Sequence, residues 1–299
     1  MPISKVTIVQ ICLFAALLPA SPVRSQIEAL KDSLIRISAD ARGAVGISLL
    51  PVGSGKLLSI NGRMRLPMQS VFKFPLGICV LDQVDKGKLS LDQKIHVSAA
   101  DWIKNTYSPM RDKCQAGDAD ITIREMLAFT VSKSDNNGCD FFFRLLGGPK
   151  KVNDYIHSLG IRDIAIVATE KEMHAAWDVQ YGNWCTTDAM ASLLKLVYLG
   201  KCLSPSSNTL LMELLTATDT GPRRLKGLLE PGTVVAHKTG SSDTNKGITP
   251  ATNDAGIITL PSGEHLIVVV FVSDARADEA MRESVIARIA KAACVHYGT

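Results

Sequence analysis

The sequence has no C-x-x-C pair and only seven cysteines in 299 residues, which argues against a zinc ribbon, a thioredoxin-type site or a disulfide-built scaffold. It also has no run of five or six like charges, and a net charge of +4 gives no basis for a nucleic-acid partner. G-x-S-x-G, H-E-x-x-H and Walker A motifs are absent, which removes three common enzyme signatures. The hydrophobic fraction of 46% supports a buried core and excludes intrinsic disorder.

Residues 1–25 differ in character from the rest of the chain. Lys5 gives a positive start, residues 6–20 are almost entirely apolar, and small residues follow, as in a secretory signal peptide. We place the cleavage after Ser25, with cleavage after Ala20 as the alternative. The apolar stretch is short for a membrane anchor, and no other segment could span a membrane. Export would make disulfides possible among the six remaining cysteines, although the sequence selects no pairing.

Hydrophobic periodicity indicates helices and strands in a distinctive order. An amphipathic helix is expected over 26–42 and a final helix over 278–295, with a largely helical region between about 70 and 216. The expected strands are 44–52, 57–60, 234–237, 255–260 and 265–272.

Strands at both ends of the chain, joined by short turns, favour one antiparallel sheet. We predict an α/β fold in which this sheet is flanked by the terminal helices. Residues 26–63 and 217–299 would form the α/β domain, and residues 64–216 an inserted all-α domain.

Ser70-Val71-Phe72-Lys73 is the first motif able to carry chemistry. An apolar helix follows it, so Ser70 is expected at a helix start, where free N–H groups can stabilise an oxyanion. Lys73 shares the same helix face and can reach the hydroxyl, which needs a neighbour to accept its proton. The alternative interpretation is a serine cap beside a solvated lysine, and a second S-x-x-K at 192–195 lies in an ordinary apolar helix.

Two triplets follow downstream, Ser134-Asp135-Asn136 and Lys238-Thr239-Gly240. The lysine of the second lies on a predicted strand, where Gly240 lets a ligand approach the backbone closely. Each triplet alone could be a polar loop or a strand end. Together, S-x-x-K, S-D-N and K-T-G in this order resemble the penicillin-recognising serine enzymes.

Glu170 narrows the resemblance. Glu170-Lys171-Glu172-Met173-His174 lies in a loop-like stretch between the two triplets and is similar to the E-x-x-L-N segment on the omega loop of class A β-lactamases. The resemblance covers essentially the whole chain after the signal segment. Residues 68–73, the Met173-His174 pair and residues 236–240 look most like the PER-type extended-spectrum branch.

The resemblance implies a serine acyl-enzyme mechanism for hydrolysis of the β-lactam amide. Ser70 would attack the carbonyl, and its proton would pass to Lys73, or to Glu170 through a water. Ser134, held by Lys73 and Lys238, would relay a proton to the leaving nitrogen. Glu170 would activate the deacylating water.

The residues implied to bind substrate are Tyr107, Asn136, His174, Arg224, Thr239, Gly240 and Ser241. Backbone N–H groups of Ser70 and Ser241 would form the oxyanion hole. Lys238, Thr239 and Ser241 would bind the substrate carboxylate, supplemented by Arg224, with Arg223 as the alternative. Asn136 would contact the side-chain amide of the substrate, and Tyr107 would line the entrance.

The resemblance also implies that no metal or cofactor is needed and that the partner is a small β-lactam. A secreted, periplasmic monomer is expected, without membrane attachment after signal cleavage.

Several residues depart from the family pattern. His174 stands where most class A enzymes have asparagine, and it can titrate. Ala168 and Asn183 replace an Arg–Asp pair, so the usual salt bridge across the loop neck cannot form. The connection 242–251 is longer than usual, which suggests a widened site that accepts bulky oxyimino cephalosporins. Gln69 and Ser242 stand where class A carbapenemases carry a cysteine pair, so efficient carbapenem hydrolysis is not expected.

Two alternatives share part of the pattern. A low-molecular-weight DD-peptidase would share the three motifs but lack a deacylating base, which makes Glu170 the discriminating residue. An exported sensor acylated by β-lactams would be the non-enzymatic alternative, and such sensors usually carry a membrane segment that this sequence lacks after residue 25.

Overall fold

The computed structural model describes residues 22–53 and 55–298. The α-helices are α1 (Pro22–Ala39), α2 (Lys73–Asp85), α3 (Pro109–Lys113), α4 (Ile123–Leu127), α5 (Asn136–Leu146), α6 (Pro149–Ser158), α7 (Glu170–Ala175), α8 (Thr187–Tyr198), α9 (Pro205–Thr216) and α10 (Glu279–Tyr297). The strands are β1 (Ala44–Pro51), β2 (Leu58–Ile60), β3 (Leu66–Pro67), β4 (Lys94–Val97), β5 (Ala119–Thr122), β6 (Ile164–Ala165), β7 (Trp184–Cys185), β8 (Val235–Ser241), β9 (Thr252–Thr259) and β10 (His265–Ser273). Short 3-10 turns are η1 (Gln69–Phe72), η2 (Ala99–Asp101) and η4 (Trp177–Gly182), and η3 (Ala128–Ser132) is π-helical.

The main sheet joins the two ends of the chain, as predicted. Its strand order is β2-β1-β10-β9-β8, and every neighbouring pair is antiparallel. The central strand β10 is buried along almost its whole length, because helices cover both faces of the sheet. The edge strand β8 continues to Ser241, four residues beyond the predicted end, so the whole K-T-G motif lies on a strand.

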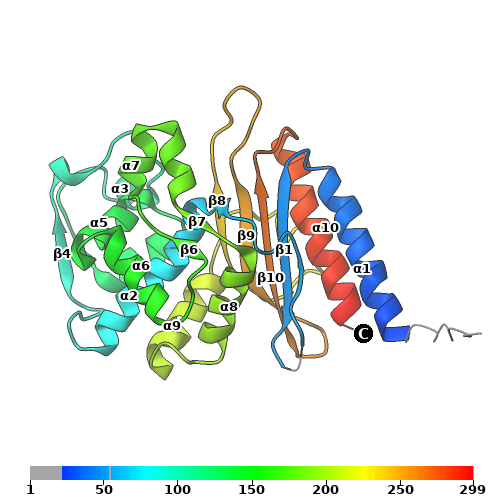
Figure 1. The fold of residues 1–299 in the computed structure, drawn as a ribbon. Helices are drawn as coiled ribbons and strands as arrows, with labels where there is room; N and C mark the ends of the chain where they lie inside the picture. The colour runs from blue at the N-terminus through cyan, green and yellow to red at the C-terminus, as the bar shows by residue number, and fades with distance from the viewer. Residues whose placement is uncertain (1–21, 54, 299) are drawn as a thin grey trace, which may run out of the picture.

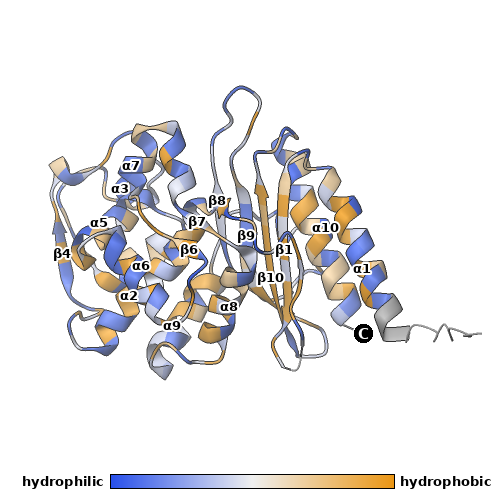
Figure 2. Ribbon diagram, in the orientation of Figure 1, coloured by the Kyte–Doolittle hydropathy of each residue, from blue (hydrophilic) through white to orange (hydrophobic). Residues whose placement is uncertain are grey.

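Two hydrophobic cores hold the layers together. The helices α1 and α10 lie side by side over one face of the sheet (Figure 1) and bury residues such as Leu34, Val285 and Ile289 against β1, β9 and β10. The helical part of the chain packs on the other face through residues such as Phe72 and Phe271. Hydrophobic residues accordingly concentrate on the strands and on the inward sides of these helices (Figure 2). Burying each such side chain contributes about 1.5–3 kcal/mol.

The inserted region between β2 and β8 is predominantly helical, with strands that the pattern did not reveal. The strands β3, β7 and β6 form one small sheet, and β4 pairs with β5. Each of them has only two to four residues, which is too short for an alternating hydrophobic pattern to be recognised. The proposed division of the chain at residues 63/64 and 216/217 stays a prediction.

The N-terminal prediction is tested only in part. Residues 1–21, which carry most of the predicted signal peptide, lie outside the described residues, so the signal and its cleavage site stay predictions. The helix α1 begins at Pro22 and ends at Ala39, earlier at both ends than the expected 26–42. Within the described part of the chain, no helix combines the length and apolarity needed to cross a bilayer. The six cysteines of the described residues are all free thiols, and Cys79, Cys139 and Cys185 are buried.

Candidate active site

Ser70 lies in the 3-10 turn η1 that leads directly into α2, at the helix start that the sequence predicts. The backbone before it is held on two sides. Asn253 on β9 donates through Nδ2 to the carbonyls of Pro67 (2.7 Å) and Met68 (3.2 Å), and Met68 N–H donates to the Asn183 carbonyl (2.8 Å). These contacts fix the position from which the Ser70 hydroxyl enters the cleft.

The residue before Ser70, Gln69, has φ +48°, in the left-handed region that costs a non-glycine residue about 1 kcal/mol or more. Its amide Nε2 donates to Gln180 Oε1 at 2.6 Å, which helps to hold this conformation. Gly240 on the neighbouring strand β8 is required for a related reason. A Cβ at Gly240 would lie 2.3 Å from the Met68 carbonyl, so the glycine lets β8 approach the segment that carries Ser70. The sequence had suggested ligand approach as the reason for this glycine.

Lys73 is completely buried, and its Nζ makes polar contacts with four residues of the site. Its Nζ lies 3.0 Å from Ser70 Oγ, 2.7 Å from the Ser134 carbonyl and 2.8 Å from Glu170 Oε1, and it also donates to Asn136 Oδ1. An ammonium has three N–H donors, so these four acceptors saturate it. The arrangement places a group that can exchange protons directly beside the serine hydroxyl.

Ser134 lies between two buried lysines. Its backbone has φ +59° and follows the π-helical turn η3, a distortion that is frequent at functional sites. Lys238 Nζ donates to Ser134 Oγ at 2.8 Å and to the Thr239 carbonyl at 3.0 Å. Burial, and then the positive charge of Lys73, hold the pKa of Lys238 well below its usual range. Lys238 can therefore supply a proton to the Ser134 hydroxyl or withdraw one from it, while Lys73 fixes the Ser134 carbonyl.

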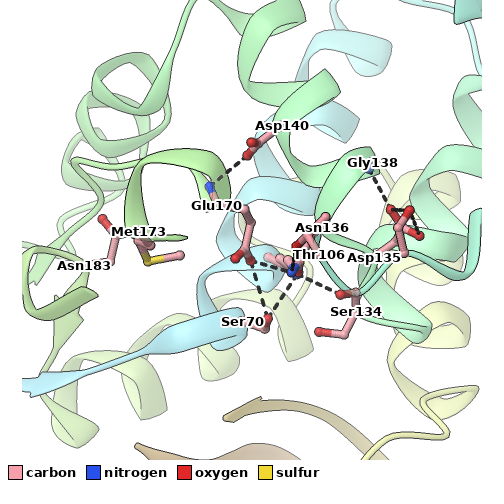
Figure 3. Close-up of polar contacts among 12 residues, drawn as sticks. Ser70, Thr106, Ser134, Asp135, Asn136, Gly138, Asp140, Glu170, Met173 and Asn183 are labelled. Carbon is pink, nitrogen blue, oxygen red and sulfur yellow. Dashed lines mark hydrogen bonds and ion pairs between the residues drawn. The ribbon is translucent and has the colours of Figure 1, made fainter. Parts of the chain in front are cut away.

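Glu170 is the first residue of the short helix α7, and two separate caps fix it there. Thr169 and Glu172 form a reciprocal capping box. Asp140 on α5 accepts from the backbone N–H groups of Glu170 (2.8 Å) and Lys171 (2.9 Å), as Figure 3 shows for Glu170. The carboxylate of Glu170 then reaches Ser70, whose Oγ lies 3.5 Å from its Oε1.

Asp140 is a residue that the sequence analysis missed. Its only signal is its place four residues after Asn136, on the same face of α5. Burial, and then the negative charge of Glu170, raise the pKa of Asp140 to about 6.

The neck of the loop that contains α7 is closed without a salt bridge. We call residues 167–183 the Ω segment. Asn183 Oδ1 accepts from the backbone N–H groups of Val167 (2.8 Å) and Ala168 (2.9 Å), and Nδ2 donates to the Ala168 carbonyl (2.8 Å). One neutral amide thus replaces the missing Arg–Asp pair by binding the backbone directly.

Two cavities of about 570 and 250 Å³ meet at Ser70. The larger one runs between the Ω segment and the end of β8, and His174 and Tyr107 line it. Tyr107 is 56% exposed, in agreement with a place at the entrance, and His174 is also exposed. Asn136 lines both cavities, while its amide also donates to Thr106 Oγ1 at 2.7 Å.

The smaller cavity is bounded by the end of β8. Thr239, Gly240 and Ser241 line it together with Ser134. Because β8 is the edge strand of the sheet, its outer side is turned toward this cavity and not toward another strand. Thr239 Oγ1 is also hydrogen-bonded to Thr220 Oγ1 at 2.6 Å, which orients its hydroxyl.

Arg224 lies beneath β8 with only 5% of its surface exposed. Nη1 donates to the carbonyls of Gly240 (3.1 Å) and Asn253 (3.0 Å), Nη2 donates to Ser241 Oγ (2.7 Å), and Nε pairs with Glu283 (3.2 Å). The guanidinium is therefore connected to the cavity through the Ser241 hydroxyl. The alternative residue, Arg223, also pairs with Glu283, at 2.7 Å.

The cleft thus brings the Ser70 hydroxyl within hydrogen-bond distance of a lysine ammonium and a glutamate carboxylate, an arrangement that can support nucleophilic catalysis. Among the residues that the structure describes, no three His, Cys, Asp or Glu side chains are arranged to hold a metal ion.

Known proteins with the same sequence pattern and fold are β-lactamases. The model of the beta-lactamase enzyme family matches residues 25–297. Extended-spectrum beta-lactamase PER-1 from Pseudomonas aeruginosa is 43% identical over 264 residues, which cover 88% of this chain and 86% of that protein. A solved β-lactamase from Chitinophaga pinensis is 52% identical with a TM-score of 0.88, covering 89% of this chain and 98% of that one. A class A β-lactamase from Bacteroides cellulosilyticus is 36% identical with a TM-score of 0.87, covering 91% and 98% of the two chains.

Each match extends over most of this chain and of the matched protein, and the matches agree with the motifs and with the fold. The chain therefore belongs to the class A β-lactamase family, on the branch that includes PER-1.

Proposed function

We propose that this enzyme hydrolyses the amide bond of penicillins and cephalosporins, including oxyimino cephalosporins, through an acyl-enzyme on Ser70, and so gives resistance to these antibiotics. The observation that carries the proposal is the direct contact of Lys73 Nζ with both Ser70 Oγ (3.0 Å) and Glu170 Oε1 (2.8 Å). A poor nucleophile is activated when a neighbouring base lies within hydrogen-bond distance. Lys73 and Glu170 both lie within that distance of Ser70 Oγ.

In acylation, Ser70 Oγ bonds to the lactam carbonyl carbon and its proton leaves to Lys73, or to Glu170 through a water. The N–H groups of Ser70 and Ser241 stabilise the oxyanion. Collapse of the tetrahedral intermediate breaks the C–N bond, and the leaving nitrogen takes a proton from Ser134 Oγ. Lys238 restores that proton, since its Nζ donates to Ser134 Oγ at 2.8 Å, while Lys73 holds the Ser134 backbone through its carbonyl.

In deacylation, Glu170 removes a proton from a water that attacks the ester carbonyl, and Ser70 is released with its proton. The caps from Thr169 and Asp140 support this role, because they hold the glutamate at the start of α7. A DD-peptidase would have no such base and would remain acylated.

Recognition of the substrate carboxylate falls to Lys238, Thr239 and Ser241, with Arg224 acting through the Ser241 hydroxyl. An anion bound there would favour the charged form of Lys238, whose pKa is low in the free enzyme. On the other side of Ser70, Asn136, Tyr107 and His174 would meet the acylamino side chain. The larger cavity of about 570 Å³ favours bulky oxyimino substituents there.

The decisive experiment is a turnover assay with a chromogenic cephalosporin. Many turnovers per enzyme are expected, whereas a penicillin-binding protein or a sensor would give a single burst. Glu170→Gln is expected to accumulate an acyl-enzyme visible by intact-mass spectrometry, and an adduct no longer-lived than that of the wild type would remove Glu170 from this role. Hydrolysis of benzylpenicillin without hydrolysis of cefotaxime or ceftazidime would overturn the oxyimino part of the proposal. Imipenem is expected to be a poor substrate.

We also propose that the enzyme is exported to the periplasm and is a monomer. The N-terminal residue of the protein recovered from a periplasmic extract tests the predicted cleavage after Ser25. Light scattering on purified protein tests the monomer.

A further inference from the structure

The Ω segment forms one wall of the larger cavity, and this wall is fixed at both of its ends but exposed in the middle. Asp140 holds the start of α7, and Asn183 closes the neck of the Ω segment. Between them, residues 174–178 are exposed, and 174–177 line the cavity. The width of the cavity therefore depends on the contacts that hold the second half of the Ω segment, the turn η4, in which Gln180 already accepts from Gln69 at 2.6 Å.

Tyr181 in η4 reaches across to the end of β10. Its hydroxyl donates to Asp274 Oδ1 at 2.6 Å, a short bond to a charged acceptor. Burial and the hydrogen bond to Asp274 raise the pKa of Tyr181 above its usual range, so the hydroxyl keeps its proton at neutral pH. The bond is thus available throughout the working range of the enzyme.

Asp274 is well placed to act as an anchor, because its own backbone is attached to the base of the opposite wall. Thr249 and Ala275 exchange two backbone hydrogen bonds of 2.9 and 3.0 Å, and Asp274 N–H donates to the Pro250 carbonyl at 3.4 Å. These contacts join the segment after β10 to the foot of the connection between β8 and β9.

That connection, residues 242–251, is a hairpin. Asn245 and Ile248 exchange two backbone hydrogen bonds of 2.9 Å, and the two residues between them, Lys246 and Gly247, both have positive φ, as in a type I′ turn. Figure 1 shows it projecting beyond the sheet, toward the same end of the molecule as α7. Its first residues, Ser242 and Asp243, line the cavity opposite Trp177. Asp274 thus connects the two walls at a single point.

We propose that Tyr181 and Asp274 form a tether that holds the Ω segment at a fixed distance from the β8–β9 hairpin, so that Tyr181 is a positioning residue for bulky side chains of the substrate. The inference rests on the proposed hydrolysis of oxyimino cephalosporins. A small side chain such as that of benzylpenicillin would contact less of the wall formed by the Ω segment. Hydrolysis of benzylpenicillin should therefore depend less on the position of that wall.

The test uses four tether variants and one control variant of the whole enzyme. Tyr181→Phe removes the donor. Asp274→Gly removes the acceptor but suits the left-handed backbone at this position, where φ is +49°. Asp274→Asn also tolerates that backbone and keeps an acceptor oxygen. The fourth variant combines Tyr181→Phe with Asp274→Gly. Tyr198→Phe is the matched control, since Tyr198 lies in α8 and its ring packs on His265.

Tyr181→Phe and Asp274→Gly are each expected to raise KM for ceftazidime by about three- to tenfold, with kcat/KM for benzylpenicillin within about twofold of wild type. The double variant should match either single one, and Asp274→Asn and Tyr198→Phe should resemble wild type. Backbone amides of residues 174–182 should exchange hydrogen faster in Tyr181→Phe.

Unchanged exchange in Tyr181→Phe, additive effects in the double variant, or Asp274→Asn behaving like Asp274→Gly would each overturn the tether. Equal losses for both substrates would assign the bond a merely structural role and would also overturn it. If the wild type does not hydrolyse ceftazidime, the substrate part of the proposed function is wrong, and the exchange measurement alone decides the tether.

Discussion

Replacing Asn183 with alanine is expected to loosen the neck of the Ω segment, because its amide makes three hydrogen bonds across the neck, next to the short β6–β7 pairing. The change leaves the N–H groups of Val167 and Ala168 and the carbonyl of Ala168 without their partner. An unsatisfied buried polar group costs about 1–3 kcal/mol. Ala168 is buried and Val167 is accessible to water, so we expect a total loss of about 2–4 kcal/mol.

Thermal unfolding and single-turnover kinetics measure the effect together. A loss of this size corresponds to a fall in Tm of about 5–10 °C for a chain of this length. Because Glu170, the proposed general base, lies in the same segment, its displacement should slow deacylation by about tenfold or more. The acyl-enzyme would then persist in intact-mass spectra of the variant.

Asn208→Ala is the matched control. It removes the same chemical group, but Asn208 Oδ1 has no hydrogen-bond partner within the described part of the chain. This variant should retain the deacylation rate of the wild type. If Asn183→Ala melts within about 1 °C of wild type and deacylates normally, the neck is held by something other than this amide, and the reasoning fails.

Three further predictions follow from contacts around the cleft. Gly240→Ala should lower kcat/KM by about tenfold or more and stability by about 1–3 kcal/mol, since its Cβ would collide with a backbone carbonyl that cannot move freely; melting curves and steady-state kinetics check both. Because the pKa of Asp140 is raised to about 6, the stability that it contributes is present below about pH 4 and is lost as the pH rises through 6. The free energy of unfolding of Asp140→Asn should therefore rise relative to that of the wild type by about 2–3 kcal/mol between pH 4 and pH 7 in denaturant titrations. A difference between the two proteins that does not change with pH would contradict this. Because the pKa of Lys238 is lowered, kcat/KM should decline with rising pH well before an ordinary lysine titrates, and Lys238→Arg should remove that alkaline limb.

The sequence was sufficient for the parts of the fold that depend on local pattern. Long apolar runs such as that of β10 and the periodic face of α10 have lengths and spacings that only one element type satisfies. The end of β8 was missed, because the apolar pattern stopped at His237; Lys238 was expected on the strand, but the polar residues Thr239 to Ser241 do not look like one. They form one because β9 pairs with them residue for residue, which is a tertiary effect.

The chemical residues of the site were predictable for a different reason. Ser70, Lys73, Ser134 and Lys238 occur in motifs whose residue types the reaction itself requires. The residues that hold these four side chains in position belong to no such motif. Asn253 holds the backbone before Ser70 from a strand almost two hundred positions away, and nothing in its neighbourhood along the chain indicates this.

Arg224 shows that a sequence motif can identify a residue without giving the way in which that residue acts. The sequence placed a positive charge near the substrate carboxylate, and the structure places that charge beneath the strand, 2.7 Å from Ser241 Oγ and paired with Glu283. A buried guanidinium with four hydrogen bonds is costly to turn toward a ligand, because the carbonyls of Gly240 and Asn253 would lose their partner. Its influence on the substrate must therefore pass through the orientation of the Ser241 hydroxyl and through the electrostatic field below β8. The positive charge of Arg224, which the motif assigns to substrate binding, instead supports the strand β8, on which the proposed binding residues lie.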